Sequence, residues 1–487
     1  MGKKSILTSS KIKILQNQAS PPIILVLFGI TSDLAHKMII PALYHLERHS
    51  KLPRFFRIVG VSRQDLTGAG ISKLITAAVK SSQKKPQTSA LKKLINRFST
   101  IRGDAESLST YESIKSHLNA LEGGKVCANR LWYFSTLPQL YETIVTNLEK
   151  SGVLSDCLAQ GRNLRILVEK PFGHDYASAR KLNSELGKYF AESHIYRIDH
   201  YVGKETVQNL IVARFANSIF EPLWNKDYID YIEISALESE GLEQRGDYFD
   251  GSGTLSDMVQ NHILQLLALT AMDEPVELRS ELIRKEKTKI LQALSFDASS
   301  IVRGQFQDYK KTVGRESQTE TFVALKAKLE LPRWKNVPIY LRTGKKLGKK
   351  ITEISIHFKE LPKCLFVGCA GNVLTFRIQP DESVYLQINN KVPGFGVKLH
   401  QGKLEFSYNS NFKTELPSAY ERLLLDFLQG DQRLFISSEE VEASWKFVDK
   451  VRSVMNKTPL IEYKEGSNGP KEAEEILKKD GREWHTK

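Results

Sequence analysis

Short apolar runs and helical patterns alternate over roughly the first two hundred residues. Residues 21–29, PPIILVLFG, are an apolar run opened by two prolines and closed by a glycine, which is typical of a buried parallel strand. Apolar residues at helical spacing follow over 33–46, where Pro41 requires a kink or a local break. Further strands are expected at residues 56–62, 129–138 and 163–173. The alternation predicts an α/β domain, a doubly wound parallel sheet of the Rossmann type, over residues 21–200.

A second pattern begins after residue 200. Apolar and polar residues alternate there as they do in half-buried antiparallel strands, at 228–238, 337–344, 351–361, 372–380 and 382–390. Long helices with one apolar face are expected between these segments, at 255–272 and 419–430. The pattern predicts an α+β domain with a large, mostly antiparallel sheet over 201–487. Residues 1–20 are expected to form a flexible N-terminal tail.

The chain length, the apolar runs and the first twenty residues predict the class of protein. A chain of 487 residues exceeds the roughly 250 to 300 at which a single core stops growing, so two domains are expected. No apolar run approaches the roughly 18 residues that cross a bilayer, and the first twenty residues lack the apolar core of a secretory signal. We therefore expect a soluble, cytoplasmic protein without a membrane partner.

The cysteines indicate the redox compartment, and the net charge indicates the kind of partner. Cys127, Cys157, Cys364 and Cys369 are too few and too scattered for a disulfide framework, which favours a reducing compartment. The formal charge of +14 suggests anionic partners, yet the basic residues are spread along the chain without an aromatic-interleaved module. Small phosphorylated ligands account for this charge as well as nucleic acid does, and no nucleic-acid partner is predicted.

A glycine after the first strand opens a candidate phosphate turn, FGITSDLAHK at 28–37. Such a junction directs free backbone N–H groups and the positive end of a helix dipole at an anion, such as the pyrophosphate of a dinucleotide. Ser32 stands where a second glycine would let the phosphates approach, so an ordinary strand-to-helix turn is the alternative. After the second strand, Arg63 suits a 2′-phosphate, although Asp65 is near and a solvated arginine is the alternative.

Two stretches place ionisable residues where a substrate would bind. VEKPFG, 168–173, ends a parallel strand at the sheet edge where α/β folds bind ligands, so Glu169 and Lys170 can reach a cofactor and a substrate. A solvated ion pair is the alternative there. RIDHYVGKE, 197–205, packs six polar or ionisable side chains into nine positions, and burying them unpaired would be costly. The residues alone leave open what this second stretch holds.

His262 is the candidate general base. It borders the apolar face of the helix predicted at 255–272, where a lone histidine is more often structural than catalytic. If Asp199 accepts a hydrogen bond from one ring nitrogen, the other nitrogen is oriented to take a proton. The assignment therefore depends on these two residues meeting in the fold.

Four separated stretches together resemble one family. GITSDLAHK, EKPFG, RIDHYVGKE and DMVQNH occur in the order and approximate spacing of the glucose-6-phosphate dehydrogenases. The likeness continues through RFANSIFEPLWN, LRTGKKL, AYERLLLDFLQGDQRLF and YKEGSNGP, and it covers about residues 22 to 470. It implies oxidation of D-glucose 6-phosphate to 6-phospho-D-glucono-1,5-lactone with reduction of NADP⁺. This is the first step of the oxidative pentose phosphate pathway, and a homodimer or homotetramer is expected to perform it.

The resemblance also implies roles for individual residues. His262 matches the family's general base and Asp199 the carboxylate that orients it. The positions that match substrate-binding residues are Lys170, His200, Tyr201, Lys204, Glu238, Asp257, Lys345 and Lys350. Those that match NADP-binding residues are Gly29, Thr31, Ser32, Asp33, Arg63, Tyr133 and again Lys170. No metal is implied. Ser32 departs from the glycine usual in the family, and Asp247 stands where many relatives have a second glycine.

Two other classes of protein are the alternatives. A related oxidoreductase that acts on an unphosphorylated sugar has no evident need for His200, Tyr201 and Lys204 together. A non-catalytic nucleotide sensor or a basic nucleic-acid binder would not need His262 and Asp199 in addition. Retention of the whole set therefore favours the phosphorylated sugar as substrate.

Overall fold

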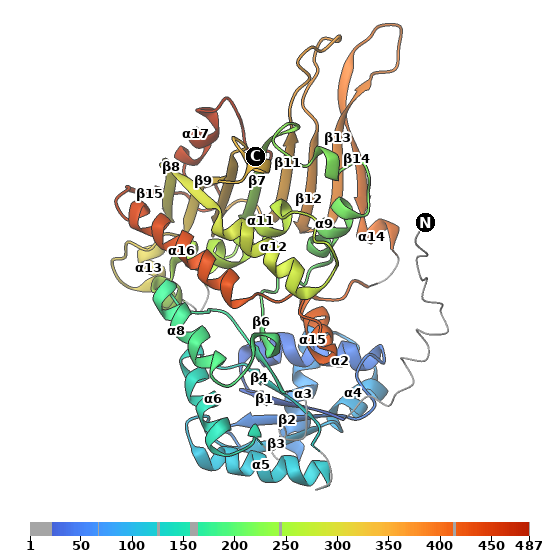
Figure 1. Ribbon diagram of the computed structural model, residues 1–487, viewed down its shortest axis with the longest axis vertical. Helices are drawn as coiled ribbons and strands as arrows, with labels where there is room; N and C mark the ends of the chain where they lie inside the picture. The colour runs from blue at the N-terminus through green and yellow to red at the C-terminus, as the bar shows by residue number, and fades with distance from the viewer. Residues whose placement is uncertain are drawn as a thin grey trace. The chain divides into compact units, whose positions relative to one another are not determined.

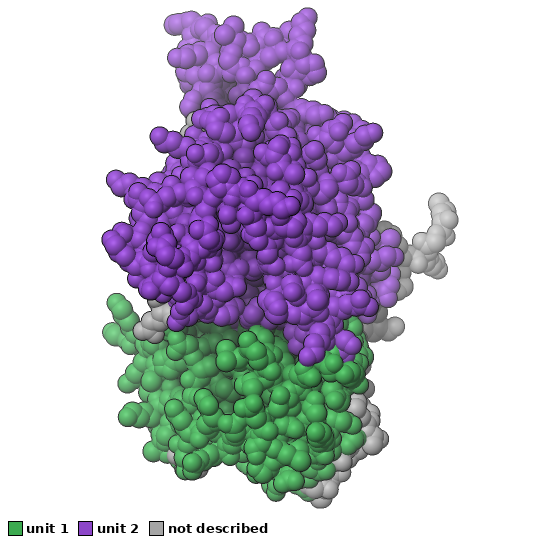
Figure 2. Space-filling model, turned by 90° about the vertical axis from the view of Figure 1, so that its left-hand side faces the viewer, with its two compact units in different colours: residues 1–169, 185–196, 424–430 green, residues 170–184, 197–423, 431–487 purple. Residues whose placement is uncertain are grey.

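The computed structural model describes residues 22–66, 68–123, 127–155, 164–242, 246–412 and 415–486, so the predicted N-terminal tail lies outside the described residues. The chain forms two compact units, which Figure 2 shows in green and purple. Unit 1 comprises Met1–Glu169, Glu185–Tyr196 and Leu424–Gly430. Unit 2 comprises Lys170–Ser184, Arg197–Leu423 and Asp431–Lys487.

Unit 1 is built on a six-stranded sheet in the order β3-β2-β1-β4-β5-β6. β1 (Ile23–Phe28) is buried throughout and lies between β2 and β4, both parallel to it. The other strands are β2 (Phe56–Ser62), β3 (Phe98–Arg102), β4 (Asn129–Phe134), β5 (Leu164–Val168) and β6 (Ile195–Arg197). The predicted doubly wound parallel sheet is confirmed. β3 and β6 were not predicted; β3 is half-buried and lacks a continuous apolar run, and β6 has only three residues.

The helices of unit 1 accommodate the proline that the sequence placed inside a helical pattern. The π-helix η1 (Ala35–Ile39) leads into α2 (Ile40–Arg48), and Pro41 lies in the first turn of α2. The helix is continuous at this point, because the N–H of Ile40, the residue before the proline, donates to the carbonyl of Ala35 in η1. The predicted helix is confirmed, and at Pro41 the structure has a change from π-helical to α-helical bonding. The other helices are α3 (Ala69–Ser82), α4 (Thr88–Ile95), α5 (Leu108–Glu122) and α6 (Tyr141–Lys150), while α8 (Tyr176–Gly187) and α15 (Ala419–Gln429) have residues in both units.

Unit 2 contains a nine-stranded sheet in the order β14-β13-β12-β11-β7-β10-β9-β8-β15. Neighbouring strands are antiparallel except for the parallel pairs β7–β10 and β8–β15, so the predicted mostly antiparallel sheet is confirmed. The strands are β7 (Ile229–Leu237), β8 (Leu294–Phe306), β9 (Phe322–Leu329), β10 (Ile339–Gly344), β11 (Ile351–Phe358), β12 (Val373–Gln379), β13 (Ser383–Lys391), β14 (Leu399–Ser407) and β15 (Leu460–Tyr463). β8, β9, β14 and β15 were not predicted; in β14 most side chains are exposed on both faces, so it lacks the alternation of a half-buried strand.

Helices lie against this sheet, as Figure 1 shows for α11, α12 and α16. The helix predicted over 255–272 begins as a π-helix, η6 (Leu255–Ile263), and continues as α11 (Leu264–Ala271). η6 packs on β7, β10 and α16. The remaining helices of unit 2 are α9 (Glu205–Phe215), α10 (Gly246–Asp250), α12 (Ser280–Gln292), α13 (Tyr309–Val313), α14 (Tyr408–Asn411), α16 (Ser438–Met455) and α17 (Glu472–Lys478).

Two further observations bear on the expected class of protein. Within the described ranges, no helix is both long enough and apolar enough to cross a membrane. Cys364 and Cys369, five positions apart, form a disulfide bond in the loop between β11 and β12. This local bridge was not anticipated from the scattered cysteines.

Candidate active site

The centre of the site is a buried pair formed by His262 and Asp199. His262 lies near the end of η6, and Asp199 follows β6 by two residues. His262 Nδ1 is 2.5 Å from Asp199 Oδ1, and the same oxygen accepts the backbone N–H of Tyr201 at 2.9 Å. Both side chains are about 1% exposed. The two residues on which the sequence assignment depended therefore meet.

The second ring nitrogen of His262 faces a lysine. Lys170 Nζ lies 2.8 Å from His262 Nε2 and also donates to the backbone carbonyl of Asp257 at 3.2 Å. An ammonium group only donates, so Nε2 is the acceptor and Nδ1 carries the proton that Asp199 accepts. The imidazole is thereby held in one tautomer and one orientation.

Charge and burial set the protonation of the pair. Burial raises the pKa of Asp199, but the adjacent His262 outweighs this and holds that pKa well below its usual range. Burial lowers the pKa of His262; Asp199 opposes this shift and Lys170 adds to it. The result at neutral pH is a neutral imidazole beside a carboxylate, which is the state that a general base requires.

A chain of alternating charges adjoins the histidine. Asp257 Oδ1 is 3.5 Å from Lys170 Nζ, and its other oxygen is 3.3 Å from Lys345 Nζ. Lys345 also donates to Glu238 Oε2 at 2.6 Å. Burial opposes both charges, yet the lysines lower the pKa of Asp257, and the two carboxylates raise the pKa of Lys345. Asp257 and Lys345 are therefore charged near neutral pH.

Local structure explains why these residues converge. Glu238 and Lys345 directly follow β7 and β10, a parallel pair in which Leu237 lies opposite Gly344. The carboxyl ends of parallel neighbours lie at one sheet edge, so both side chains are brought together. Asp257 and His262 are five positions apart in a helix whose bonds run from i to i+5, which keeps both near one face.

The predicted phosphate-binding residues surround the same histidine. The Tyr201 ring stacks on His262 with 4.1 Å between ring centroids, and the His200 ring meets His262 edge-on at 4.7 Å. Lys204 Nζ lies over the Tyr201 ring and donates to Gln379 Oε1 at 2.8 Å. Burial lowers the pKa of Lys204, Glu382 opposes this, and Lys350 adds to it by repulsion. Lys350 is exposed and is paired with Glu240 at 2.6 Å, so its influence on the cluster is electrostatic.

Asp199, His200 and His262 also have potential metal-ligand atoms within 4.8 Å of one another. However, both nitrogens of His262 are already engaged, one by Asp199 and the other by Lys170. The Lys170 ammonium would also repel a metal cation. This arrangement suits proton transfer better than metal binding.

The predicted dinucleotide residues lie in unit 1. β1 ends at Phe28, and Gly29 follows with φ +78°; a Cβ there would collide with the backbone carbonyl of Ser135, so only glycine fits. Thr31 and Ser32 follow in the turn, and Asp33 is the first helical residue ahead of η1; Thr31 and Asp33 are exposed. Arg63 is exposed just beyond β2, the strand beside β1.

Tyr133 occupies a different environment from these turn residues. It is fully buried in β4, and its hydroxyl donates to Glu169 Oε1 at 2.6 Å. The structure therefore groups the phosphate-turn residues and gives Tyr133 a carboxylate partner in the interior of the unit.

Two family models match consecutive parts of the chain. The model described as glucose-6-phosphate dehydrogenase, NAD binding domain, matches residues 26–209, and the model of the C-terminal domain of the same enzyme matches residues 211–485. The chain belongs to the glucose-6-phosphate dehydrogenase family. As a member it is an oxidoreductase with a dinucleotide-binding domain, and the resemblance seen in its motifs is confirmed.

Individual relatives agree over nearly the whole length. The glucose-6-phosphate 1-dehydrogenase of Chlamydia pneumoniae is 41% identical over 493 aligned positions, which cover 95% of this chain and 96% of that protein. The glucose-6-phosphate 1-dehydrogenase of Bacillus subtilis (strain 168) is 38% identical, and the alignment covers 96% of this chain and 99% of that protein. A solved glucose-6-phosphate dehydrogenase in complex with its substrate glucose-6-phosphate is 32% identical with a TM-score of 0.88, covering 96% of this chain and 100% of that one. The solved glucose-6-phosphate 1-dehydrogenase of Mycobacterium avium is 34% identical with a TM-score of 0.85, covering 96% of this chain and 99% of that one.

Sequence reasoning missed two neighbours of the cluster. Gln379, the last residue of β12, accepts from Lys204, and the Tyr420 ring is stacked over His200 at 6.5 Å. The signal for Gln379 was a polar residue and a proline at the end of an alternating strand. Tyr420 lies in AYERLLLDFLQGDQRLF, a family-like stretch to which no role had been given.

Ser32, which stands where the resemblance implies a glycine, acts as a cap within the phosphate turn. Its Oγ accepts the N–H of Ala35 at 3.0 Å and lies 2.7 Å from Ser135 Oγ. One amide at the start of the helix is therefore already occupied. We expect Ser32→Gly to free this amide for a phosphate oxygen and to tighten binding of the reduced dinucleotide about tenfold, as one charge-assisted hydrogen bond would.

Fluorescence titration of the reduced dinucleotide measures this change. Ser135→Ala is the matched control, because it removes the second hydroxyl while Ser32 keeps its bond to Ala35. Its dissociation constant should stay near the wild-type value. Weaker binding by the glycine variant would show that the Ser32 hydroxyl itself serves the dinucleotide.

Proposed function

We propose that the chain oxidises glucose 6-phosphate at C1 with NADP⁺, giving 6-phospho-D-glucono-1,5-lactone and NADPH, with His262 as the general base. The observation that carries the assignment of the base is the hydrogen-bonded pair of Asp199 and His262, whose pKa shifts leave a neutral imidazole. The reaction is the first step of the oxidative pentose phosphate pathway.

The turn after β1 fits NADP⁺. The backbone at Gly29 is closed too tightly for a side chain, the helix η1 begins just beyond, and Arg63 offers a guanidinium for the 2′-phosphate. When bound, the cofactor accepts the hydride that leaves C1. The chain's own part is to bind the sugar phosphate, orient C1 and remove the hydroxyl proton.

Proton removal is the task of His262. The C1 hydroxyl donates its proton to Nε2 as the carbonyl forms, and Asp199 stabilises the imidazolium through Nδ1. Lys170 now holds Nε2 at 2.8 Å, so the substrate hydroxyl has to replace this contact. Until then the lysine helps to keep the pKa of His262 low and the base unprotonated.

Anchoring of the phosphate is assigned to His200, Tyr201 and Lys204, with Lys350 contributing charge. The support is electrostatic: Lys204 is partly buried and is repelled by Lys350, and both effects lower its pKa. A phosphate dianion beside Lys204 and Lys350 would offset both the cost of burial and the repulsion between the two lysines. Glu238, Asp257 and Lys345 are assigned to the sugar hydroxyls, since their charged oxygens and nitrogen adjoin the base. Binding energy at the phosphate then serves to orient C1.

Domain roles and assembly complete the proposal. Residues 21–200 bind the dinucleotide, and residues 201–487 bind the sugar phosphate and join copies of the chain in a homodimer or homotetramer. Self-association is supported by exposed apolar side chains on two loops of the nine-stranded sheet, namely Leu361, Leu365, Phe366, Val367, Phe395 and Val397. The proposed location is the cytoplasm, and no nucleic-acid partner is proposed.

Absorbance of the reduced cofactor tests the reaction, with glucose 6-phosphate or glucose as substrate and NADP⁺ or NAD⁺ as acceptor. We expect rapid reduction with glucose 6-phosphate and NADP⁺. Lys204→Met should raise KM for glucose 6-phosphate by about ten- to a hundredfold, because a charge-assisted bond to the phosphate is lost. KM for glucose should hardly change.

Lys310→Met is the matched control, since Lys310 is an exposed lysine of unit 2 paired with Glu316. Its KM values should equal those of the wild type. An unchanged KM for glucose 6-phosphate in the Lys204 variant would remove this lysine from the phosphate site. Reduction with glucose as efficient as with its phosphate would refute the proposed substrate.

A further inference from the structure

The helix that carries His262 ends in carbonyl groups that side chains from other segments bind. η6 and α11 run without interruption from Leu255 to Ala271. The last carbonyl groups of any helix lack partners within it. Here the Met272 N–H takes the carbonyl of Ala268, and Arg214 Nη1 donates to the carbonyls of Leu269 at 3.4 Å, Thr270 at 3.1 Å and Met272 at 2.8 Å.

Two buried tryptophans complete this set of donors. Trp224 Nε1 donates to the carbonyl of Thr270 at 2.7 Å, and Trp334 Nε1 donates to the carbonyl of Ala271 at 2.9 Å. The guanidinium of Arg214 lies over the Trp224 ring, 5.2 Å from its centroid. Every carbonyl of the last turn is thus bound, and only Arg214 binds several of them at once.

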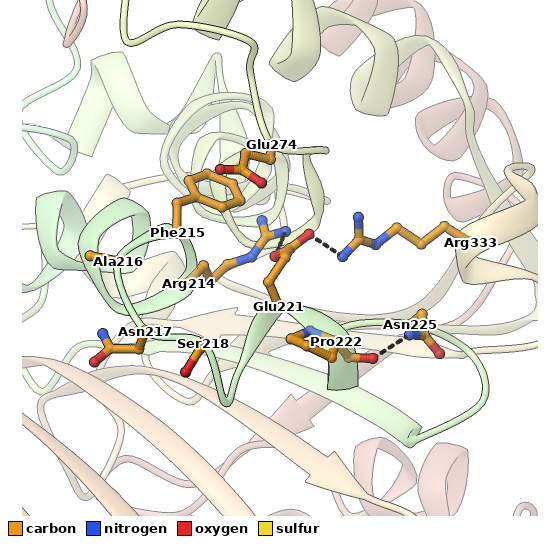
Figure 3. Close-up of a pocket in the computed structure, with 10 residues that line it drawn as sticks. All are labelled: Arg214, Phe215, Ala216, Asn217, Ser218, Glu221, Pro222, Asn225, Glu274 and Arg333. Atoms are coloured by element: carbon orange, nitrogen blue, oxygen red, sulfur yellow. Dashed lines mark hydrogen bonds and ion pairs between the residues drawn. The ribbon is translucent and has the colours of Figure 1, made fainter. Parts of the chain in front are cut away.

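Arg214 is itself held in place by Glu221. In Figure 3, Arg214 and Arg333 point at Glu221 in a cavity of about 780 Å³ that they help to line. Glu221 Oε2 is 3.0 Å from Arg214 Nη2, and Oε1 is 2.5 Å from Arg333 Nη2. Burial lowers the pKa of Arg214 to about 10, partly offset by Glu221, so the guanidinium is charged at neutral pH. A positive charge at a helix C-terminus is favourable because it opposes the helix dipole.

Arg214 also belongs to the helix that begins at the proposed phosphate anchor. Lys204 immediately precedes α9 (Glu205–Phe215), and Arg214 lies in its last turn. At about 1.5 Å per residue, this helix spans roughly 15 Å between the two. One rigid helix therefore leads from Lys204 to Arg214, and a second leads from the carbonyls that Arg214 binds back to His262.

We propose that Arg214 is a positioning residue that fixes the distance between the phosphate anchor at Lys204 and the base at His262. The inference rests on the proposed function. Binding the phosphate speeds the oxidation only if C1 then lies at the right distance from Nε2, and small displacements of reacting groups are expensive in rate. Without the hydrogen bonds from Arg214 to the carbonyls at the end of α11, both helices stay intact. However, α9, which follows Lys204, can then shift relative to the helix that carries His262.

Arg214→Lys tests the inference. Lysine keeps the positive charge but lacks the planar fork that serves several carbonyls and a carboxylate together. We expect kcat with glucose 6-phosphate to fall about tenfold or more, because the base is displaced. The Kd of glucose 6-phosphate, measured by titration calorimetry without cofactor, should stay within about threefold, because the anchor itself is intact. Arg214→Met should lower kcat further.

Arg333→Lys is the matched control. It makes the same chemical change on the other side of Glu221, and no hydrogen bond joins the Arg333 side chain to a carbonyl of α11 within the described residues. The side chain binds Glu221, Asp273 and the carbonyl of Trp224, and its guanidinium lies over the Trp334 ring. Its melting temperature should fall about as much as that of Arg214→Lys, with kcat unchanged. The inference is overturned if kcat falls by the same factor in both variants. It is also overturned if Arg214→Lys weakens binding of glucose 6-phosphate as much as it lowers kcat, or if it leaves kcat unchanged.

Two further measurements keep the test decisive. If Arg214→Lys is not recovered folded, Glu221→Gln loosens the guanidinium and should lower kcat about threefold at constant Kd, by the same displacement of the base; an unchanged kcat there overturns the inference. Wild-type turnover separates the two hypotheses. Failure of the wild type to reduce NADP⁺ with glucose 6-phosphate refutes the proposed function before any variant is compared.

Discussion

His262→Asn is expected to lower kcat with glucose 6-phosphate by about 10²- to 10⁴-fold, the usual contribution of a general base. Asparagine can still hydrogen-bond to Asp199, but its amide does not accept a proton near neutral pH. The Kd of glucose 6-phosphate should remain within about threefold, because in the proposed site other residues bind the phosphate and the remaining sugar hydroxyls. Initial rates of cofactor reduction give kcat, and titration calorimetry gives Kd.

His357 supplies the control for losing a buried histidine. It lies in β11 of the same unit, with Nε2 at 2.8 Å from Glu233 Oε1 and its ring stacked on Tyr231 at 3.9 Å. His357→Asn should lower the melting temperature and leave kcat near the wild-type value. Near-normal turnover in the His262 variant would refute the assigned base. Equal losses of kcat in both variants would attribute the effect to the fold.

Features that depend on local pattern were predictable from the sequence. β1 is buried on both faces, so it must be a continuous apolar run, and that run was visible between Pro22 and Gly29. Pro41 marked the point at which π-helical η1 gives way to α2, because proline removes one backbone donor from a helix. The pairing of Asp199 with His262 was anticipated through the chemistry that a base needs, and the fold supplies it.

Features that depend on distant contacts were not predictable. Lys170 and His262 are 92 positions apart, and nothing in either stretch reveals that the ammonium meets Nε2. Apolar spacing over 255–272 indicated a helix but not the π geometry that aligns Asp257 with His262, because both helix types bury one face. Arg214 belongs to a stretch that resembled the family, yet its role is defined by carbonyls more than fifty residues away.

Asp199→Asn is expected to lower kcat by about 10²-fold or more and to shift the pH dependence of kcat/KM in a defined direction. In the wild type, burial lowers the pKa of His262 and Asp199 partly restores it. Without the carboxylate, the pKa falls further. The acid limb of kcat/KM, which reports the base of the free enzyme, should therefore move to lower pH, while the weaker base and the unstabilised imidazolium reduce the rate.

Lys170→Met is expected to shift the pKa of the His262 imidazole in the opposite direction. Lys170 lowers the pKa of His262, so its removal should move the acid limb to higher pH. Methionine keeps most of the volume without the charge, and the loss of the expected substrate contact would affect the height of the profile rather than its midpoint. Profiles of kcat/KM for the wild type and both variants, recorded at constant ionic strength, distinguish the outcomes. Shifts in the same direction for both variants would mean that the titrating group is not the imidazole between Asp199 and Lys170, and another base would have to be sought.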